Sequence, residues 1–149
     1  MAITNADNAF GLRAIGKVGQ NRDNQGLSEY GIAASSSAIY QNDPIMMAAT
    51  GKIIVGTAAA VLLGSLNGVF YTDATNQKPT WANHLAASNT ATDIVGFVSD
   101  DPYERFEIQS DAALTVAEVG MNADIVYAAG ATPNYISKVE LDHSDLKTA

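Results

Sequence analysis

The sequence predicts an all-β fold, a small β-barrel or sandwich with an extended N-terminal arm and at most one short helical turn. Residues 94–98 form an uninterrupted apolar run, which is typical of a strand covered on both faces. Residues 104–109 alternate in polarity, as in a strand with one face in solvent. From Glu29 onward, turn-forming residues recur roughly every 8–12 residues, the spacing of short strands in a barrel or sandwich.

Residues 93–110 are the centre of this pattern, because they hold both of these strands. Residues 99–102 separate the strands with turn formers, and Pro102 lacks the N–H that a sheet ladder needs. We therefore expect a β-hairpin or a β-arch here. The alternation predicts that Phe106 and Ile108 are in the core, with Arg105 and Glu107 in solvent.

The chain is predicted to divide into an arm and one domain. Residues 1–28 are rich in Asn and Gly and have few apolar residues, which fits an extended arm that is ordered only where it finds a groove. A disordered tail fits the same composition. Residues 29–149 are predicted to form a single β-rich domain, with a barrel core over 29–112, C-terminal strands over 113–142 and a polar tail over 143–149. Thr115 and Glu118 have capping-box spacing and Gly120 offers a stop, which predicts one helical turn.

Composition limits the possible functions. The 149 residues contain no cysteine, which excludes disulfides and thiolate chemistry within the chain. The net charge of −8 and the scattered lysines argue against a nucleic-acid partner. Only 16% of the residues are charged, whereas about a quarter is usual in soluble proteins. This deficit predicts a surface that other protein chains cover.

Neither membrane insertion nor secretion is predicted. Residues 53–72 carry no charge and include a GxxxG pattern, but glycines, polar residues and turn signals interrupt them. Buried strands explain this stretch better than a membrane helix does. The first ten residues have neither the basic start nor the apolar segment of a secretory signal.

No constellation in the sequence predicts an enzyme, a cofactor site, a metal site or a small-molecule substrate. His143, Ser144 and Asp145 supply the residue types of a hydrolase triad, but sequence neighbours do not point at one another as a relay requires. His84 has no metal-ligating partners at suitable spacing. The acidic turn around residues 100–104 fits carboxylates that accept backbone hydrogen bonds better than it fits a cation loop.

The candidate contact residues lie in the arm and in the polar stretch 73–92, which holds the single tryptophan of the chain. An exposed Trp81 would anchor a protein contact, and the alternative is that its ring folds back over the end of the barrel. The predicted protein-interaction residues are Phe10, Leu12, Arg13, Ile15, Lys17, Arg22 and Trp81.

Several short phrases of the sequence together resemble a known family, the head decoration or cement proteins of tailed bacteriophages. The resemblance covers roughly residues 29–142 and rests on phrases in a fixed order: EYGIA, NDP at residues 42–44, GVFYTD at 68–73, DDP to FEIQ within 100–109, VGMNAD at 119–124 and SKVELD at 137–142. The family often has a second tryptophan near the position of Trp81, where this chain has Asn83 and His84.

The resemblance implies a β-rich structural protein that binds the outer surface of a phage capsid at subunit junctions and stabilises the shell. Its expected partners are the major capsid protein and further copies of itself, with a trimer favoured over a dimer because copies on a symmetric shell meet at its axes. The expected location is the virion, after synthesis in the host cytoplasm. Two alternatives remain open: a tail or neck component, and a stand-alone β-barrel module for a peptide or glycan, which an exposed aromatic platform would favour.

Overall fold

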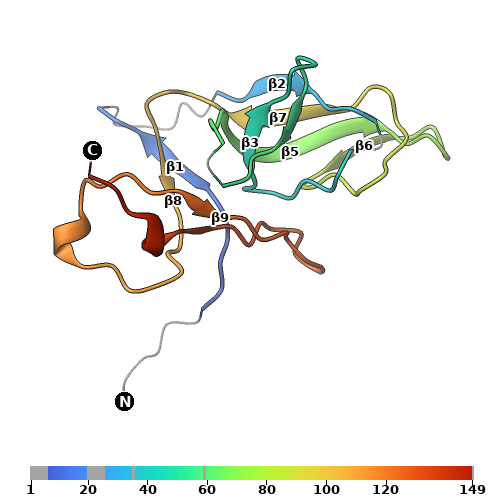
Figure 1. Cartoon of the computed structure of the whole chain (residues 1–149). Coiled ribbons are helices and arrows are strands. Elements are labelled where there is room, and N and C mark those ends of the chain that lie inside the picture. The colour runs from blue at the N-terminus through green and yellow to red at the C-terminus, as the bar shows by residue number, and fades with distance from the viewer. Residues whose placement is uncertain (1–6, 20–25, 35, 59, 149) are drawn as a thin grey trace.

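The computed structural model describes residues 7–19, 26–34, 36–58 and 60–148, and its fold is all-β (Figure 1). The elements are two 3-10 turns, η1 (Val116–Glu118) and η2 (His143–Asp145), and ten strands: β1 (Arg13–Lys17), β2 (Ser28–Gly31), β3 (Pro44–Met47), β4 (Ile53–Val55), β5 (Gly64–Thr72), β6 (Pro79–Ala82), β7 (Val95–Ser99), β8 (Glu104–Glu107), β9 (Ile125–Val126) and β10 (Glu140–Leu141).

Six of these strands form one antiparallel sheet in the order β2-β7-β5-β3-β4, with β6 paired to β5. The outer strands approach each other through a single parallel bridge between Ile32 and Ile53. The sheet therefore curls strongly, but no continuous ladder closes it into a barrel. This curvature follows from the right-handed twist of strands and from the register shift of β5 between Leu66 and Gly68.

The core lies inside the curled sheet and consists mainly of β-branched and leucine side chains. Its fully buried members are Ile32, Ile39, Ile45, Ile53, Leu66, Val69, Leu85 and Val98. Gly96 interrupts the apolar run of β7 because the core leaves no room for a side chain at this position. A Cβ at this position would lie 2.8 Å from the Cδ1 atom of Ile53, so the missing side chain makes room for the core isoleucines.

The segment 93–110 is a β-arch and not a hairpin, because its two strands belong to different sheets. Strand β7 lies between β2 and β5, whereas β8 pairs with β1. The predicted alternation along β8 is present, with Phe106 and Ile108 less exposed than Arg105 and Glu107. Phe106 and Ile108 are both only half-buried, however, so the expectation that they lie in the core is wrong. Phe106 belongs to the two-stranded β1–β8 ribbon, which is separate from the main sheet and its core.

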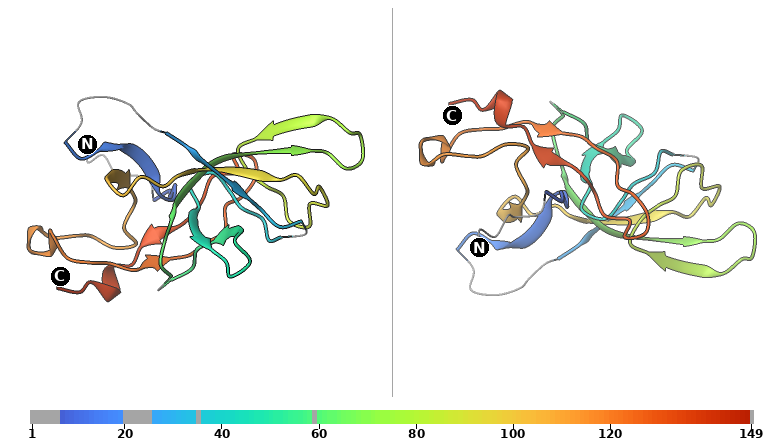
Figure 2. Two further views of the ribbon diagram at one scale, coloured as in Figure 1. Left: turned by 90° about the horizontal axis from the view of Figure 1, so that it is seen from above. Right: turned by 90° about the horizontal axis from the view of Figure 1, so that it is seen from below.

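The predicted arm contains strand β1, which pairs with β8 in a two-stranded antiparallel ribbon. The register shifts between Ala14 and Gly16, and Gly16 has a φ of 139° that suits glycine. Ile15 is the extra residue of this bulge, and its side chain faces solvent. Figures 1 and 2 show the ribbon at one end of the molecule and the β5–β6 hairpin at the other.

The C-terminal part adds the short hairpin β9–β10 and the two 3-10 turns. Turn η1 lies at the predicted place, where the Glu118 side chain accepts from the Thr115 N–H and Gly120 has a φ of 89°. Turn η2 lies in the predicted polar tail. The described residues therefore contain two short helical turns, where the sequence predicted at most one. Asp142 initiates η2 by accepting the Ser144 N–H at 2.9 Å. Among the described residues, no helix has the length and apolarity needed to cross a membrane.

Candidate interaction surfaces

The turn at Asn42 connects the arm to the main sheet. Asn42 has a φ of 65°, a conformation that asparagine tolerates better than most residues. Its carbonyl accepts the Leu12 N–H at 2.9 Å, and its side-chain amide donates to the Phe10 carbonyl at 3.0 Å. Its own N–H donates to the Leu66 carbonyl in β5 at 2.8 Å. The arm is therefore attached to the domain through Phe10 and Leu12.

The residues on either side of Asn42 attach the C-terminal segment to the same turn. The Gln41 N–H donates to the Tyr135 carbonyl at 3.1 Å, and the Gln41 carbonyl accepts the Ser137 N–H at 2.8 Å. Asp43 is fully buried, and its carboxylate accepts the Tyr40 N–H at 2.8 Å. Burial raises the pKa of Asp43 to about 6, although hydrogen bonds from Ser137 and Tyr40 act in the opposite direction. One turn thus holds the arm, the sheet and the C-terminal segment together.

The predicted arm contacts divide into charged residues with internal partners and an apolar residue that points outward. Arg13 forms an ion pair with Glu107 and lies over the Phe10 ring, 5.0 Å from its centroid. Lys17 pairs with Asp101 at 2.5 Å and is mostly covered. Ile15 is exposed. The predicted contact residue Arg22 lies outside the described residues.

The end of the molecule that carries the β1–β8 ribbon also exposes a group of large apolar side chains. We call this group the ribbon end; it consists of Ile15, Val18, Tyr103, Leu114, Val116, Val119 and Met121. Val116 is 90% exposed and Val119 is 82% exposed. The ribbon and the loop around η1 lie in the same half of the molecule (Figures 1 and 2). Large apolar side chains exposed in one region are typical of protein contact sites.

Trp81 lies in β6, which pairs with β5 of the main sheet, and 71% of its surface is exposed. It does not fold back over the core. Its ring packs against Phe70, its direct cross-strand neighbour, at a centroid distance of 4.7 Å and an angle of 49°. It also stacks on Phe97 of β7 at 5.2 Å and 21°. We call these three rings the aromatic platform.

Sequence reasoning identified Trp81 but missed Phe70 and Phe97. Both phenylalanines belong to strand segments that were predicted to be buried on both faces. The period-2 alternation gives a usable signal, because Val69 and Val98 are buried while their neighbours Phe70 and Phe97 are only half-buried. The pairing of three strands brings the rings together, and that pairing cannot be read from the local pattern.

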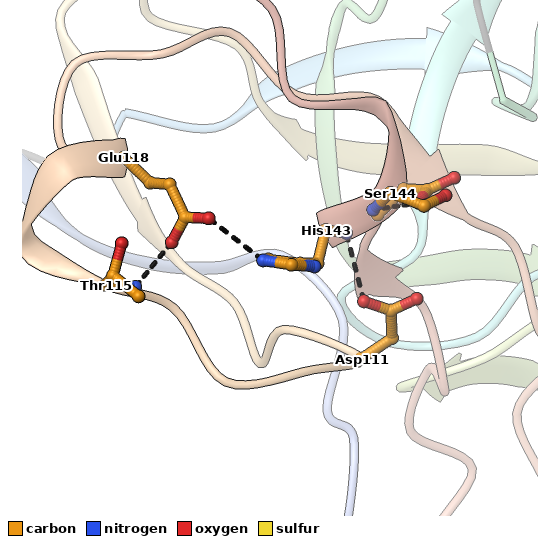
Figure 3. Close-up of polar contacts among 6 residues, drawn as sticks. Asp111, Thr115, Glu118, His143 and Ser144 are labelled. Atoms are coloured by element: carbon orange, nitrogen blue, oxygen red, sulfur yellow. Dashed lines mark hydrogen bonds and ion pairs between the residues drawn. The ribbon is translucent and has the colours of Figure 1, made fainter.

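The residues of the hydrolase-like triplet, His143, Ser144 and Asp145, do not form a relay, and Figure 3 shows the contacts of the first two. The imidazole Nε2 of His143 lies 3.0 Å from a Glu118 oxygen, and the His143 N–H donates to Asp111 at 2.9 Å. The Ser144 hydroxyl donates to Asp142 at 2.6 Å and not to the imidazole. Asp145 pairs with Lys147 at 2.8 Å. These contacts fasten η2 and η1 to each other, and the Ser144 hydroxyl is directed to Asp142 and not to His143.

The acidic residues after β7 accept hydrogen bonds and ion pairs from neighbouring strands. Asp100 accepts the Ser28 and Tyr30 hydroxyls at 2.9 and 2.6 Å. Asp101 accepts the Tyr103 N–H at 2.8 Å in addition to its pair with Lys17. Within the described part of the chain, no three acidic or imidazole side chains form a group that suits a metal ion.

His84 stacks on Tyr135 at a centroid distance of 3.8 Å and an angle of 3°. Its Nδ1 atom lies 3.1 Å from the Asn83 side-chain oxygen. Burial lowers the pKa of His84, because the charged imidazolium loses solvation there. The ring therefore packs the C-terminal segment against the sheet in its neutral form.

Comparison with known proteins returned no matching family model, no similar curated sequence and no similar solved structure.

Proposed function

We propose that the protein is a structural component of a tailed-phage virion, a decoration protein that binds the outer surface of the capsid at subunit junctions and stabilises the shell. The observation that carries this proposal is the ribbon end, which leaves several large apolar side chains in solvent. Such side chains favour burial against another protein by roughly 25 cal/mol for each Å² of apolar surface removed from water. The resemblance of residues 29–142 to capsid decoration proteins supports the same assignment.

The arm is proposed to have two parts, one that attaches it to the domain and one that contacts the shell. Residues 9–12 are fixed to the Asn42 turn, so the ribbon that follows them is presented at a defined position. Arg13 and Lys17 have acidic partners within the chain, so their positive charges are matched before any partner binds. Contact with the major capsid protein would then rest on the apolar residues of the ribbon end, with little cost for removing charges from water.

We further propose that the copies on the shell form closed homo-oligomers, with a trimer favoured over a dimer. Copies on an icosahedral surface meet at symmetry axes, and closed rings bury self-complementary or head-to-tail patches without forming fibres. The low share of charged residues supports extensive covered surface, because interface centres are depleted in charge.

The test uses the phage particles that carry this chain. Mass spectrometry should give a copy number in a fixed ratio to the major capsid protein, and a cryo-EM map should place the ribbon end against the shell. A copy number of about a dozen or fewer for each particle would instead indicate a tail or neck component. Density on the shell as isolated copies that do not touch one another would rule out the oligomer, and paired copies would replace the trimer with a dimer.

A further inference from the structure

The aromatic platform is a preformed surface and not a loose exposed side chain. The Trp81 ring is held from below by Phe97 and from the side by Phe70, and all three residues lie on paired strands of the main sheet. Gly68 is the residue of β5 opposite Phe97, and a Cβ there would lie 3.0 Å from the Ala82 carbonyl oxygen, so its missing side chain lets β5 and β6 approach closely beneath the rings. The indole therefore presents an exposed face without having to be ordered when a ligand binds.

The groove beside the platform combines apolar side chains with uncharged amide groups. A shallow groove of about 460 Å³ runs beside Trp81, and the described residues that line it include Gln41, Asn67 and Asn83 but no charged side chain. The Asn83 amide nitrogen donates to the Asn134 carbonyl at 3.1 Å and lies 3.5 Å from the Gln41 side-chain oxygen. This contact orients the Gln41 amide group so that its nitrogen is available to donate. Glu29, the β2 partner of Phe97, adds an exposed carboxylate at the edge.

We propose that the aromatic platform binds the pyranose rings of an uncharged saccharide. The apolar C–H face of such a ring stacks on an exposed indole, while amide and carboxylate groups at the edge exchange hydrogen bonds with its hydroxyls. A flat apolar surface with a few polar groups at its margin is the usual composition of a small-ligand site.

The charge of the chain and the amide groups of the groove favour a neutral saccharide over an anionic or a purely apolar ligand. An anionic ligand would meet Glu29 and a chain of net charge −8, with no cation in the groove to receive it. A purely apolar ligand without hydrogen-bonding groups would leave the amide groups of Gln41 and Asn67 without partners, and their desolvation would oppose binding. The groove shares Gln41 and Asn67 with a neighbouring groove lined by Phe10, Arg13 and Ala14, so the platform lies near the attachment of the arm. None of the ribbon-end residues lines either groove, so saccharide binding does not require the proposed contact with a shell.

The single tryptophan of the chain makes the test direct, because the indole emission reports on the platform alone. Titrating the full-length protein with cellohexaose and with chitohexaose should give a saturable change in emission with at least one of them. Calorimetry should show that Trp81→Ala weakens binding roughly tenfold or more, while Trp81→Tyr retains most of it because an aromatic face remains. Gln41→Ala and Asn67→Ala should each weaken binding several-fold.

Tyr103→Ala is the matched control, because Tyr103 is a similarly exposed aromatic residue at the ribbon end. It should leave saccharide binding unchanged. The proposal is overturned if neither hexasaccharide changes the emission, or if Trp81→Ala and Tyr103→Ala bind equally well. An indole that responds to purified shells but not to either saccharide would identify the platform as a protein contact. Because these titrations use free protein, they can fail or succeed independently of shell binding.

Discussion

The carboxylate of Asp43 accepts the backbone N–H of Tyr40 at 2.8 Å, although no part of Asp43 is accessible to solvent. Burial raises the pKa of this carboxyl group to about 6 from a usual value near 3.8. The folded protein thus binds a proton at Asp43 more tightly than the unfolded chain does. By linkage, the contribution of Asp43 to stability rises as the pH falls through 6 toward 4, and is lost as the pH rises again.

The first prediction is a pH dependence that Asp43→Asn removes. Between pH 7 and pH 4 the free energy of unfolding of the native sequence should rise by about 2 kcal/mol relative to that of Asp43→Asn. Denaturant unfolding at several pH values measures this difference. His84 has the opposite effect, because its lowered pKa makes the folded protein less stable in acid. Both proteins contain His84, so this effect cancels in the difference between them. Parallel pH profiles for the two proteins would contradict the assignment.

The second prediction concerns the attachment of the arm at Gly11. Gly11 has a φ of 71°, and a Cβ there would lie 2.4 Å from the Asn42 carbonyl oxygen and 2.5 Å from the Ser137 Cβ. Gly11→Ala should therefore destabilise the protein by roughly 2 kcal/mol, because it combines backbone strain with a clash against the central turn. Thermal and denaturant unfolding measure the change.

Gly31→Ala is the control for this substitution. Gly31 lies in strand β2, has no positive φ, and a Cβ there would meet nothing within 4 Å. It should change the free energy of unfolding by less than about 0.5 kcal/mol. Equal effects of the two substitutions would mean that residues 9–12 are not held against the domain, as expected for a loose arm.

The fold class was predictable from the sequence because period and turn signals are local. The apolar run before Ser99, the alternation after Pro102 and the capping box at Thr115 all lie where the sequence predicts them. Strand partners were not predictable, since pairing depends on residues far apart in the chain. The β1–β8 ribbon joins residues about ninety positions apart through contacts such as Arg13 with Glu107. The arm was therefore expected to be looser than it is.

The candidate surfaces were predictable only in part, for the same reason. The sequence marks Trp81 as the one indole in a polar stretch, but the platform exists only because β5, β6 and β7 lie side by side. The loop around η1 was predicted as a helical turn, and nothing local distinguishes a covered valine from an exposed one. Val116 and Val119 became candidates only when the structure showed both side chains in solvent.

The third prediction uses the alternation along β8. Phe106 is half-buried opposite Ala14, so Phe106→Ala should cost roughly 1–2 kcal/mol, less than the loss expected for a fully buried ring. Glu107→Ala removes the exposed pair with Arg13 and should cost no more than about 0.5 kcal/mol. Urea unfolding of the two variants measures both changes in the free energy of unfolding. A larger loss of stability for Glu107→Ala than for Phe106→Ala would show that the ribbon depends on its ion pair and not on packing.

The fourth prediction separates folding from binding at the ribbon end. Val116 and Val119 are 90% and 82% exposed, so the double change to serine removes almost no buried surface from the free protein. Its free energy of unfolding should stay within about 0.5 kcal/mol of the native value. If the proposed contact buries both side chains, their replacement should weaken binding to shells by roughly tenfold or more.

Val61→Ser is the matched control for this double variant, because Val61 is 91% exposed and lies in the loop between β4 and β5, outside the ribbon end. The measurement is co-sedimentation of each purified protein with phage particles that lack it, over a range of protein concentrations. Val61→Ser should bind as the native protein does, while the double variant should remain largely in the supernatant. Equal binding of the two variants would exclude the loop around η1 from the contact and restrict the shell-facing surface to the β1–β8 ribbon. Loss of binding in both would mean that exposed valines act through general adhesiveness and not through a defined face.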